Sequence, residues 1–194
     1  RNIALAELNP KAPHNAQLIA GNISAMRIAI ETPERLSIPT ILKIHEVLMA
    51  PSLDSLAGVF RDQAVWIGGQ IYSPHDAIFV PPHHSHIEFY MKDLVAYANR
   101  IDVNPLVKAA IIHAQFETIH PFVDGNGRTG RSLIHKSLKD DGVLQTIALP
   151  FSAGLLNSTN EYMNSLISFQ NGNPLPIIQQ LFKALELSLL VAEK

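Results

Sequence analysis

Apolar residues recur at helical spacing along most of the chain. Between positions 15 and 31 the large apolar side chains fall on one face of a helix, at Leu18, Ile19, Ile23, Met26 and Ile30. Start signals predict further helices after Ser37-Ile38-Pro39, after the capping box Ser85-His86-Ile87-Glu88 and after Asn104-Pro105. Asn171-Gly172-Asn173-Pro174 separates two more helices, the last running to about Leu190. The pattern therefore predicts a mainly α fold.

Residues 65–80 break the helical pattern. Short apolar runs alternate there with turn residues, in the order Trp66-Ile67, Gly68-Gly69, Ile71-Tyr72 and Ile78-Phe79-Val80, which is typical of a small hairpin. A hairpin can hold an extended target segment by strand pairing, or it can be an ordinary surface element. The pattern alone leaves both interpretations open.

Composition indicates one globular unit. The chain has 194 residues, and a chain of that size buries roughly 70% of its unfolded surface, so we expect a single domain over residues 1–194. Its formal net charge is −2 without a charge run, which argues against a general nucleic-acid binder. There is no cysteine, no apolar run of membrane-spanning length and no signal peptide, so we expect no membrane partner and a cytoplasmic location. Because the chain begins with Arg1, we expect it to be a fragment.

The segment His120–Arg128, HPFVDGNGR, carries the candidate chemistry. It joins a helix that starts after Asn104-Pro105 to a helix that opens at Asn126 or Gly127 and closes at Asp141-Gly142. A helix N-terminus preceded by glycine presents free N–H groups and a positive dipole end, which suit a phosphate. The segment therefore indicates a nucleotide-handling enzyme.

Each polar residue of this segment has a functional and a structural interpretation. His120 lies five residues before Gly125, close enough to a phosphate at this helix N-terminus to accept a proton from an attacking hydroxyl. A histidine can also merely cap a helix C-terminus. Asp124 can be an Mg²⁺ ligand or an Asx-turn residue. Arg128 and Arg131 share a helix face and suit a polyphosphate, or they are solvated or pair with Glu117 and Asp124. We expect Phe122 to anchor the loop in the core.

His83-His84-Ser85-His86 is the one tempting metal cluster. Consecutive histidines rarely converge on one ion, so a solvated loop is the preferred interpretation. Zinc-protease, P-loop and α/β-hydrolase motifs do not occur in the sequence.

At these residues the chain resembles the Fic family, whose signature is HPFx(D/E)GN(G/K)R, often followed by a second arginine three positions on. Every fixed position matches, and Arg131 supplies the second arginine. The resemblance continues in residues 114–119, 60–69 and 79–82, and in 150–156 with Tyr162 and Asn171-Gly172. It covers about residues 36–182 and implies a Fic/Fido-type helical bundle with a small β-hairpin flap at 65–80, preceded by the N-terminal helix 15–31.

The resemblance implies transfer of AMP from ATP to a Tyr, Ser or Thr hydroxyl of a target protein, auto-AMPylation included, with release of pyrophosphate. His120 matches the family's general base, and Asp124 matches its Mg²⁺ ligand. The phosphate-binding positions are Gly125, Asn126, Gly127, Arg128, Thr129, Gly130 and Arg131. The flap residues expected to position the target are Ile67, Ile78, Phe79 and Val80.

Other activities on the same scaffold stay open at this point. The branch that resembles kinases has lysine where this chain has Gly127. The motif is compatible with phosphocholine transfer or deAMPylation. A nucleotide-binding regulatory module without transfer is an alternative of another class, and the intact His120 counts against it.

Control in the family often involves an inhibitory [S/T]xxxE[G/N] helix whose glutamate pairs with the second motif arginine. No Ser or Thr of this chain is followed by Glu four residues later. In the subgroup that the chain resembles, this helix lies just before the segment similar to Asn2–Leu8. We therefore expect the chain to be a derepressed core that is more active than its longer parent.

Overall fold

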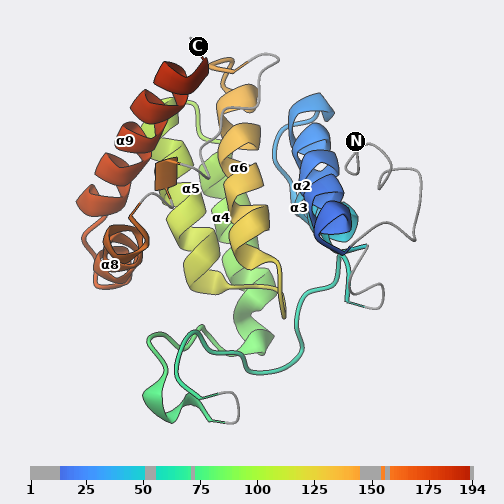
Figure 1. Ribbon diagram of the computed structural model, residues 1–194, viewed down its shortest axis with the longest axis vertical. Coiled ribbons are helices and arrows are strands. Elements are labelled where there is room, and N and C mark those ends of the chain that lie inside the picture. The colour runs from blue at the N-terminus through green and yellow to red at the C-terminus, as the bar shows by residue number, and fades with distance from the viewer. Residues whose placement is uncertain (1–13, 51–55, 71–72, 145–153, 156–157, 193–194) are drawn as a thin grey trace.

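The computed structural model describes residues 14–50, 56–70, 73–144, 154–155 and 158–192. These residues form seven α-helices and two short 3₁₀ turns (Figure 1). The helices are α2 (His14–Glu31), α3 (Ile38–Met49), α4 (Ile87–Ala98), α5 (Pro105–Ile119), α6 (Asn126–Asp140), α8 (Thr159–Gln170) and α9 (Leu175–Ala192), and the turns are η1 (Pro74–Asp76) and η2 (His84–His86). The prediction of a mainly α fold is confirmed.

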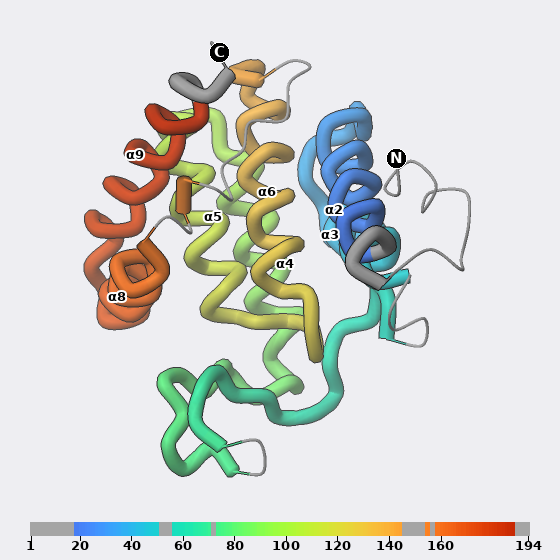
Figure 2. The backbone as a smooth tube through the Cα atoms, in the orientation of Figure 1, coloured from blue at the N-terminus to red at the C-terminus, as the bar shows by residue number. Residues whose placement is uncertain are grey.

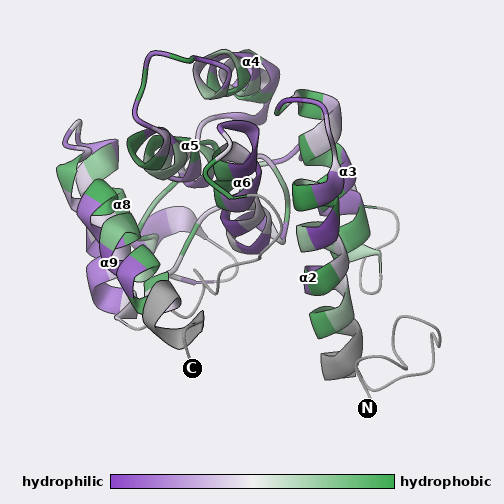
Figure 3. Cartoon of the chain, turned by 90° about the horizontal axis from the view of Figure 1, so that it is seen from above, coloured by the Kyte–Doolittle hydropathy of each residue, from purple (hydrophilic) through white to green (hydrophobic). Residues whose placement is uncertain are grey.

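Helices α5 and α6 lie at the centre of the bundle. The α2–α3 pair lies on one side of them and the α8–α9 pair on the other (Figures 1 and 3). One apolar cluster joins α2, α3 and α4 to α5 and α6, and includes Ile44, Met91 and Phe116. A second cluster joins α5 and α6 to α8 and α9, and includes Leu138 and Leu181. Helix α5 is therefore buried on two sides, which explains why its apolar residues do not form a single stripe.

Most helix ends lie where the local sequence signals predicted them. The Ser37 side chain accepts the Thr40 N–H at the start of α3, and Asn104 accepts the N–H groups of Leu106 and Val107 at the start of α5. The predicted capping box at Ser85–Glu88 is wrong. Helix α4 begins at Ile87 after η2, its cap residue makes no side-chain bond, and the Ser85 N–H donates to His83 Nδ1 instead.

The flap is a minimal hairpin. Ile67 and Phe79 form an antiparallel bridge, Gln70 and Ser73 form a second one, and no longer ladder is found among the described residues. The predicted pairing segment Ile71-Tyr72 lies outside the described residues, as do Asn2–Leu8 and all of Pro150–Leu156 except Gly154 and Leu155. Between α3 and α4 the chain passes beneath the lower ends of α5 and α6, which places the flap next to their joint (Figure 2).

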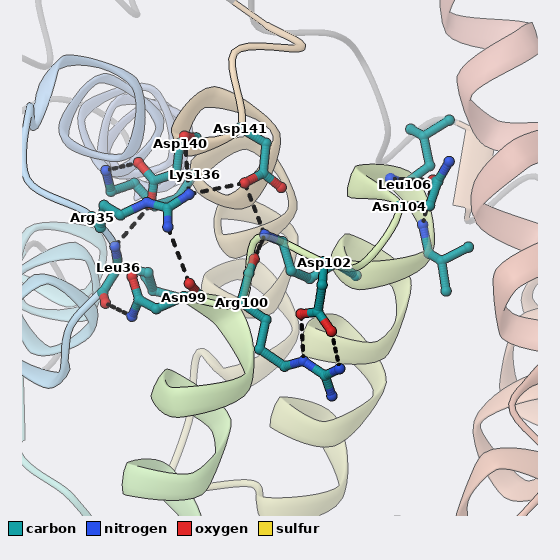
Figure 4. Close-up of polar contacts among 12 residues, drawn as sticks. Arg35, Leu36, Asn99, Arg100, Asp102, Asn104, Leu106, Lys136, Asp140 and Asp141 are labelled. Atoms are coloured by element: carbon teal, nitrogen blue, oxygen red, sulfur yellow. Dashed lines mark hydrogen bonds and ion pairs between the residues drawn. The ribbon is translucent and has the colours of Figure 1, made fainter.

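Buried lysines join the opposite end of α6 to neighbouring loops (Figure 4). Lys136 is fully buried; its Nζ donates to the carbonyls of Thr32 and Glu34 and pairs with Asp140. Lys108 Nζ pairs in the same way with Asp141, at 2.8 Å. Among the helices that the structure describes, none combines the length and apolar character needed to cross a bilayer.

Candidate functional site

The site is built on the joint between α5 and α6. His120 ends α5 in the left-handed region, at φ 49°, and is the one non-glycine residue with positive φ among the described residues. Such a conformation costs free energy and persists where the surroundings fix it. Gly125 is the N-cap of α6 and has φ 76°, and a Cβ at this position would lie 2.7 Å from Met49 Sδ. Glycine is therefore required at the helix N-terminus, both for its conformation and for space.

The loop between the two helices is closed by its own residues. The Asn126 side chain donates to the Phe122 carbonyl at 2.9 Å and accepts the Phe122 N–H at 3.0 Å. Phe122 is fully buried and stacks on the His45 ring at a centroid distance of 3.6 Å. The anchoring prediction for Phe122 is confirmed. The side chain of Asn126 is therefore engaged in closing the loop.

His45 and Arg61 lie far from the motif in the sequence and hold its loop through hydrogen bonds to the backbone. The Gly58 N–H donates to His45 Nδ1, so His45 carries its proton on Nε2, which donates to the Asp124 carbonyl at 3.0 Å. Arg61 is buried and donates to the carbonyls of His120 at 2.8 Å and Pro82 at 2.7 Å. Sequence reasoning assigned a role to neither residue. The one signal at Arg61 was its place in residues 60–69, which take part in the family resemblance.

A cavity of about 440 Å³ opens at the joint and is lined by the flap, the joint and α8. Its walls bring together six of the predicted site residues: His120, Gly127, Arg131, Ile67, Ile78 and Phe79. The cavity is also lined by residues that were not predicted as site residues. These are Trp66, Gly68 and Glu117 and, from α8, Tyr162, Met163, Leu166, Ile167 and Gln170. The α8 wall is mostly apolar. The cavity therefore has a polar end at α5 and α6 and an apolar side at α8.

The other predicted residues lie around this cavity without lining it. The Asp124 carboxylate is 62% exposed and lies 3.5 Å from Arg128 Nη2, at the start of α6. Thr129 is fully buried, and Gly130 lies against Glu117 of α5, where a Cβ would come within 2.6 Å of Oε1. Val80 is exposed. Roles for these residues in binding phosphate, metal or target stay predictions.

Burial shifts the titrations at the polar end of the cavity. Burial and, to a smaller degree, the nearby Arg61 cation lower the pKa of His120 to about 4, so His120 is neutral at physiological pH. Its Nδ1 lies 3.3 Å from the Glu117 carbonyl, which leaves Nε2 as the nitrogen with a free lone pair. Burial also raises the pKa of the Glu117 carboxyl to about 7, against the opposing effect of Arg131. The site thus holds a neutral imidazole ready to accept a proton.

Stability should therefore depend on pH through Glu117. Between its ordinary pKa of 4.5 and its folded pKa of about 7 the unfolded state releases a proton that the folded state keeps, so stability falls as pH rises. Glu117→Gln removes this loss. The free energy of unfolding of the variant, relative to that of the parent, should therefore increase by about 3 kcal/mol from below pH 4.5 to above pH 7. Urea unfolding across this range measures the difference. Glu88→Gln, whose side chain is 78% exposed, is the control and should show no such growth.

The histidine run at 83–86 forms a cluster of tilted and edge-on rings. His83 and His84 lie 4.0 Å apart between ring centroids, and His86 packs edge-on against Tyr90. Within the part of the chain that the structure describes, no group of three or more His, Cys, Asp or Glu side chains is placed to hold a metal ion.

Sequence comparison relates the chain to proteins of one kind. Residues 35–138 match the sequence model of the Fic/DOC family. Protein adenylyltransferase fic-1 of Caenorhabditis elegans is 28% identical over 159 residues, which are 80% of this chain and 28% of the worm protein. Protein adenylyltransferase Fic of Drosophila melanogaster is 31% identical over 110 residues, 55% of this chain and 20% of the fly protein. The chain spans less than a third of the length of these relatives.

Solved structures share the fold. A Fic family protein from Desulfovibrio desulfuricans superposes with a TM-score of 0.77 at 24% identity, covering 93% of this chain and 54% of that one. The BepC protein of Bartonella tribocorum, crystallised with bound AMPPNP, gives a TM-score of 0.59 at 19% identity, covering 85% and 84% of the two chains. The helical bundle with its flap is thus the Fic fold.

Proposed function

Because the chain belongs to the Fic/DOC family, we propose that it transfers AMP from ATP to a hydroxyl side chain of a target protein and releases pyrophosphate. Two relatives at 28% and 31% identity are named protein adenylyltransferases, and a structural neighbour holds AMPPNP, an ATP analogue. The intact set of motif residues supports the same activity.

The composition of the cavity is the observation that carries this proposal. One space joins a neutral imidazole, a guanidinium and an apolar wall, contributed by His120, Arg131 and α8. A nucleotide needs these three surroundings: an apolar wall for its base, a cation and helix N–H groups for its phosphates, and a base next to the α-phosphate. In this arrangement the α8 wall receives the adenine, and Arg131 with the N-terminus of α6 receives the phosphates.

The chain's own residues perform the transfer by positioning and proton transfer. His120 Nε2 accepts the proton of the target hydroxyl, whose oxygen attacks the α-phosphorus as the bond to pyrophosphate breaks. The Nδ1 contact to the Glu117 carbonyl keeps the ring oriented and its proton on the correct nitrogen. Arg61 donates to the carbonyls of His120 and Pro82, so the two segments that flank the flap are fixed to the residue that carries the base. Apolar side chains of the flap, Ile67, Ile78 and Phe79, line one wall of the cavity.

Asp124 fits the coordination that Mg²⁺ uses beside phosphates. Its carboxylate is largely exposed at the start of α6, and within the described residues its protein contacts are the Gly125 N–H and Arg128. Mg²⁺ in nucleotide sites commonly takes one or two carboxylates, with waters and phosphate oxygens completing the octahedron. When bound, the ion would neutralise phosphate charge.

Asp124→Ala is expected to remove most of the Mg²⁺ dependence of ATP binding. The parent should bind ATP roughly tenfold more tightly in Mg²⁺ than in EDTA, a difference of about 1.4 kcal/mol in binding free energy, because the ion bridges the carboxylate and the phosphates. Calorimetry in both conditions measures this ratio for the parent, for Asp124→Ala and for Asp93→Ala, which changes an exposed carboxylate of α4 outside the motif. A ratio that is equal in all three proteins would show that Asp124 is not the ligand.

Labelled ATP tests the function itself. Addition of the protein to a cell lysate with ATP labelled on the α-phosphate should give covalent label that the lysate alone does not show, whereas label on the γ-phosphate should give none beyond that of the lysate alone. Incorporation of γ label would indicate a kinase. ATP binding without incorporation of either label would indicate a regulatory module, and so would overturn the proposal.

The flap should act on the target more than on ATP. Ile78 lines the cavity, is 59% exposed and lies beside the bridge between Ile67 and Phe79, where an extended segment can pair with the backbone. Ile78→Asp should weaken target labelling about tenfold, the effect of about 1.4 kcal/mol, with a smaller change in ATP affinity. Ile101→Asp, at a site 87% exposed outside the flap, is the matched control. Target labelling as strong as that of the control would leave the flap without this role.

A further inference from the structure

Glu117 is a buried carboxyl that the mechanism above does not use. It lies three residues before His120 on α5, is 6% exposed and lines the cavity together with His120 and Arg131. Its Oε1 has no hydrogen-bond partner among the described residues, and its Oε2 lies 3.9 Å from His120 Nδ1. Burial of a polar atom without a partner is costly, and such an atom next to an active site calls for a functional explanation.

The surroundings of this carboxyl are specific. Its charged and polar neighbours are His120 after the end of α5, Arg131 on α6 and Tyr162 on α8. His113 of α5 lies on the same side of Gly130 as Oε1, and its Nε2 is 2.9 Å from the Tyr162 hydroxyl. Glycine on α6 makes the space, since a Cβ on Gly130 would collide with Oε1. His120 itself is also influenced by Arg61 and Asp124. The carboxyl therefore lies between the base and the second motif arginine.

We infer that Glu117 is a positioning residue for His120. The ionised carboxylate of Glu117 stabilises the imidazolium that His120 forms during transfer. The inference rests on the proposed function. As the O–H bond of the target hydroxyl breaks, an N–H bond forms at Nε2, the oxygen bonds to the α-phosphorus and pyrophosphate leaves with the electron pair of the broken P–O bond. The imidazolium then lies against Oε2 of Glu117 until it releases its proton to water.

The two groups act as one titrating pair. Because the carboxyl and the imidazole are close and both buried, they hold a single proton between them near neutral pH. Removal of that proton leaves a carboxylate beside a neutral imidazole, which is the state ready for transfer. The transfer rate should thus fall as pH decreases through about 7, the pKa to which burial raises the Glu117 carboxyl.

A histidine titration followed by NMR tests the pair without any activity. The imidazole resonances of His120, assigned by comparison with His120→Ala, should shift as pH passes through about 7 in the parent. In Glu117→Gln, which has the same shape but does not ionise, that step should be absent and only a step at lower pH should remain. Glu88→Gln should titrate like the parent. Identical curves for the parent and Glu117→Gln would overturn the inference.

The pH profile of transfer provides the second readout. In Glu117→Gln the decline on the acid side should move well below pH 7, and the rate at saturating ATP should drop roughly tenfold with little change in the KM for ATP. A rise in KM at an unchanged saturating rate would mean that the carboxyl binds nucleotide, and would overturn the inference. If Glu117→Gln does not fold, Glu117→Met removes the same charge with no buried polar atom.

The two readouts separate this inference from the proposed function. A step in the NMR titration that depends on Glu117, in a protein that transfers no label from ATP, would refute AMP transfer and the role of Glu117 in it, while leaving the pairing of the two groups intact. Transfer with the same pH profile and rate in the parent and in Glu117→Gln would refute the inference and leave AMP transfer standing.

Discussion

His120→Ala is expected to slow AMP transfer by about 10²–10⁴-fold, the usual contribution of a general base, with little change in ATP affinity. His120 is neutral, lines the cavity and has its Nδ1 engaged by the Glu117 carbonyl. A base acts on the attacking hydroxyl, so its removal raises the barrier of the chemical step without removing contacts to the nucleotide ground state. Truncation to alanine also leaves the loop intact, because Phe122, Asn126 and Arg61 hold it through other atoms.

Two measurements on the same preparation decide this prediction. Incorporation of α-labelled ATP reports transfer, and calorimetry reports ATP affinity. His86→Ala, which changes an exposed histidine in η2, is the matched control and should behave like the parent. Equal losses of affinity and transfer in His120→Ala would indicate that His120 binds the nucleotide and does not act as the base.

Sequence signals predicted those parts of the fold that depend on neighbouring residues. Asn104-Pro105 and Ser37 mark helix starts by bonds that close within three residues, so the chain carries the whole signal. The same logic failed at Ser85. There the capping serine follows His83, whose ring accepts the Ser85 N–H and favours a 3₁₀ turn instead. A cap that competes with a second local acceptor cannot be assigned from spacing alone.

Sequence signals did not predict the groups that act across the fold. His45 meets the motif loop from 79 residues away and Arg61 from 59, and neither position has a local pattern that separates it from other polar residues. The apolar side of the cavity comes from α8. The sequence pattern of these residues predicts a helix and does not indicate that they line a cavity. Glu117 likewise reads as a polar residue within an apolar helix. Its burial depends on Gly130 of the neighbouring helix.

Lys136→Ala is expected to be the most destabilising of the proposed substitutions. Lys136 is fully buried in α6, and its Nζ donates to the carbonyls of Thr32 and Glu34 and pairs with Asp140, whose other oxygen accepts the Leu36 N–H (Figure 4). Removing the ammonium leaves a buried carboxylate without its cation and two carbonyls without their donor. Breaking one half of a buried pair in this way typically costs about 3–5 kcal/mol.

Thermal and urea unfolding of Lys136→Ala should show this loss, and the matched control is Lys43→Ala. The pair between Lys43 and Glu46 is about half exposed, so its loss should cost less than about 1 kcal/mol. The double change Lys136→Met with Asp140→Asn should recover part of the stability, because no unpaired charge then remains buried. A loss in Lys136→Ala no larger than that in the control would mean that the buried pair does not hold the α2–α3 connection against α6.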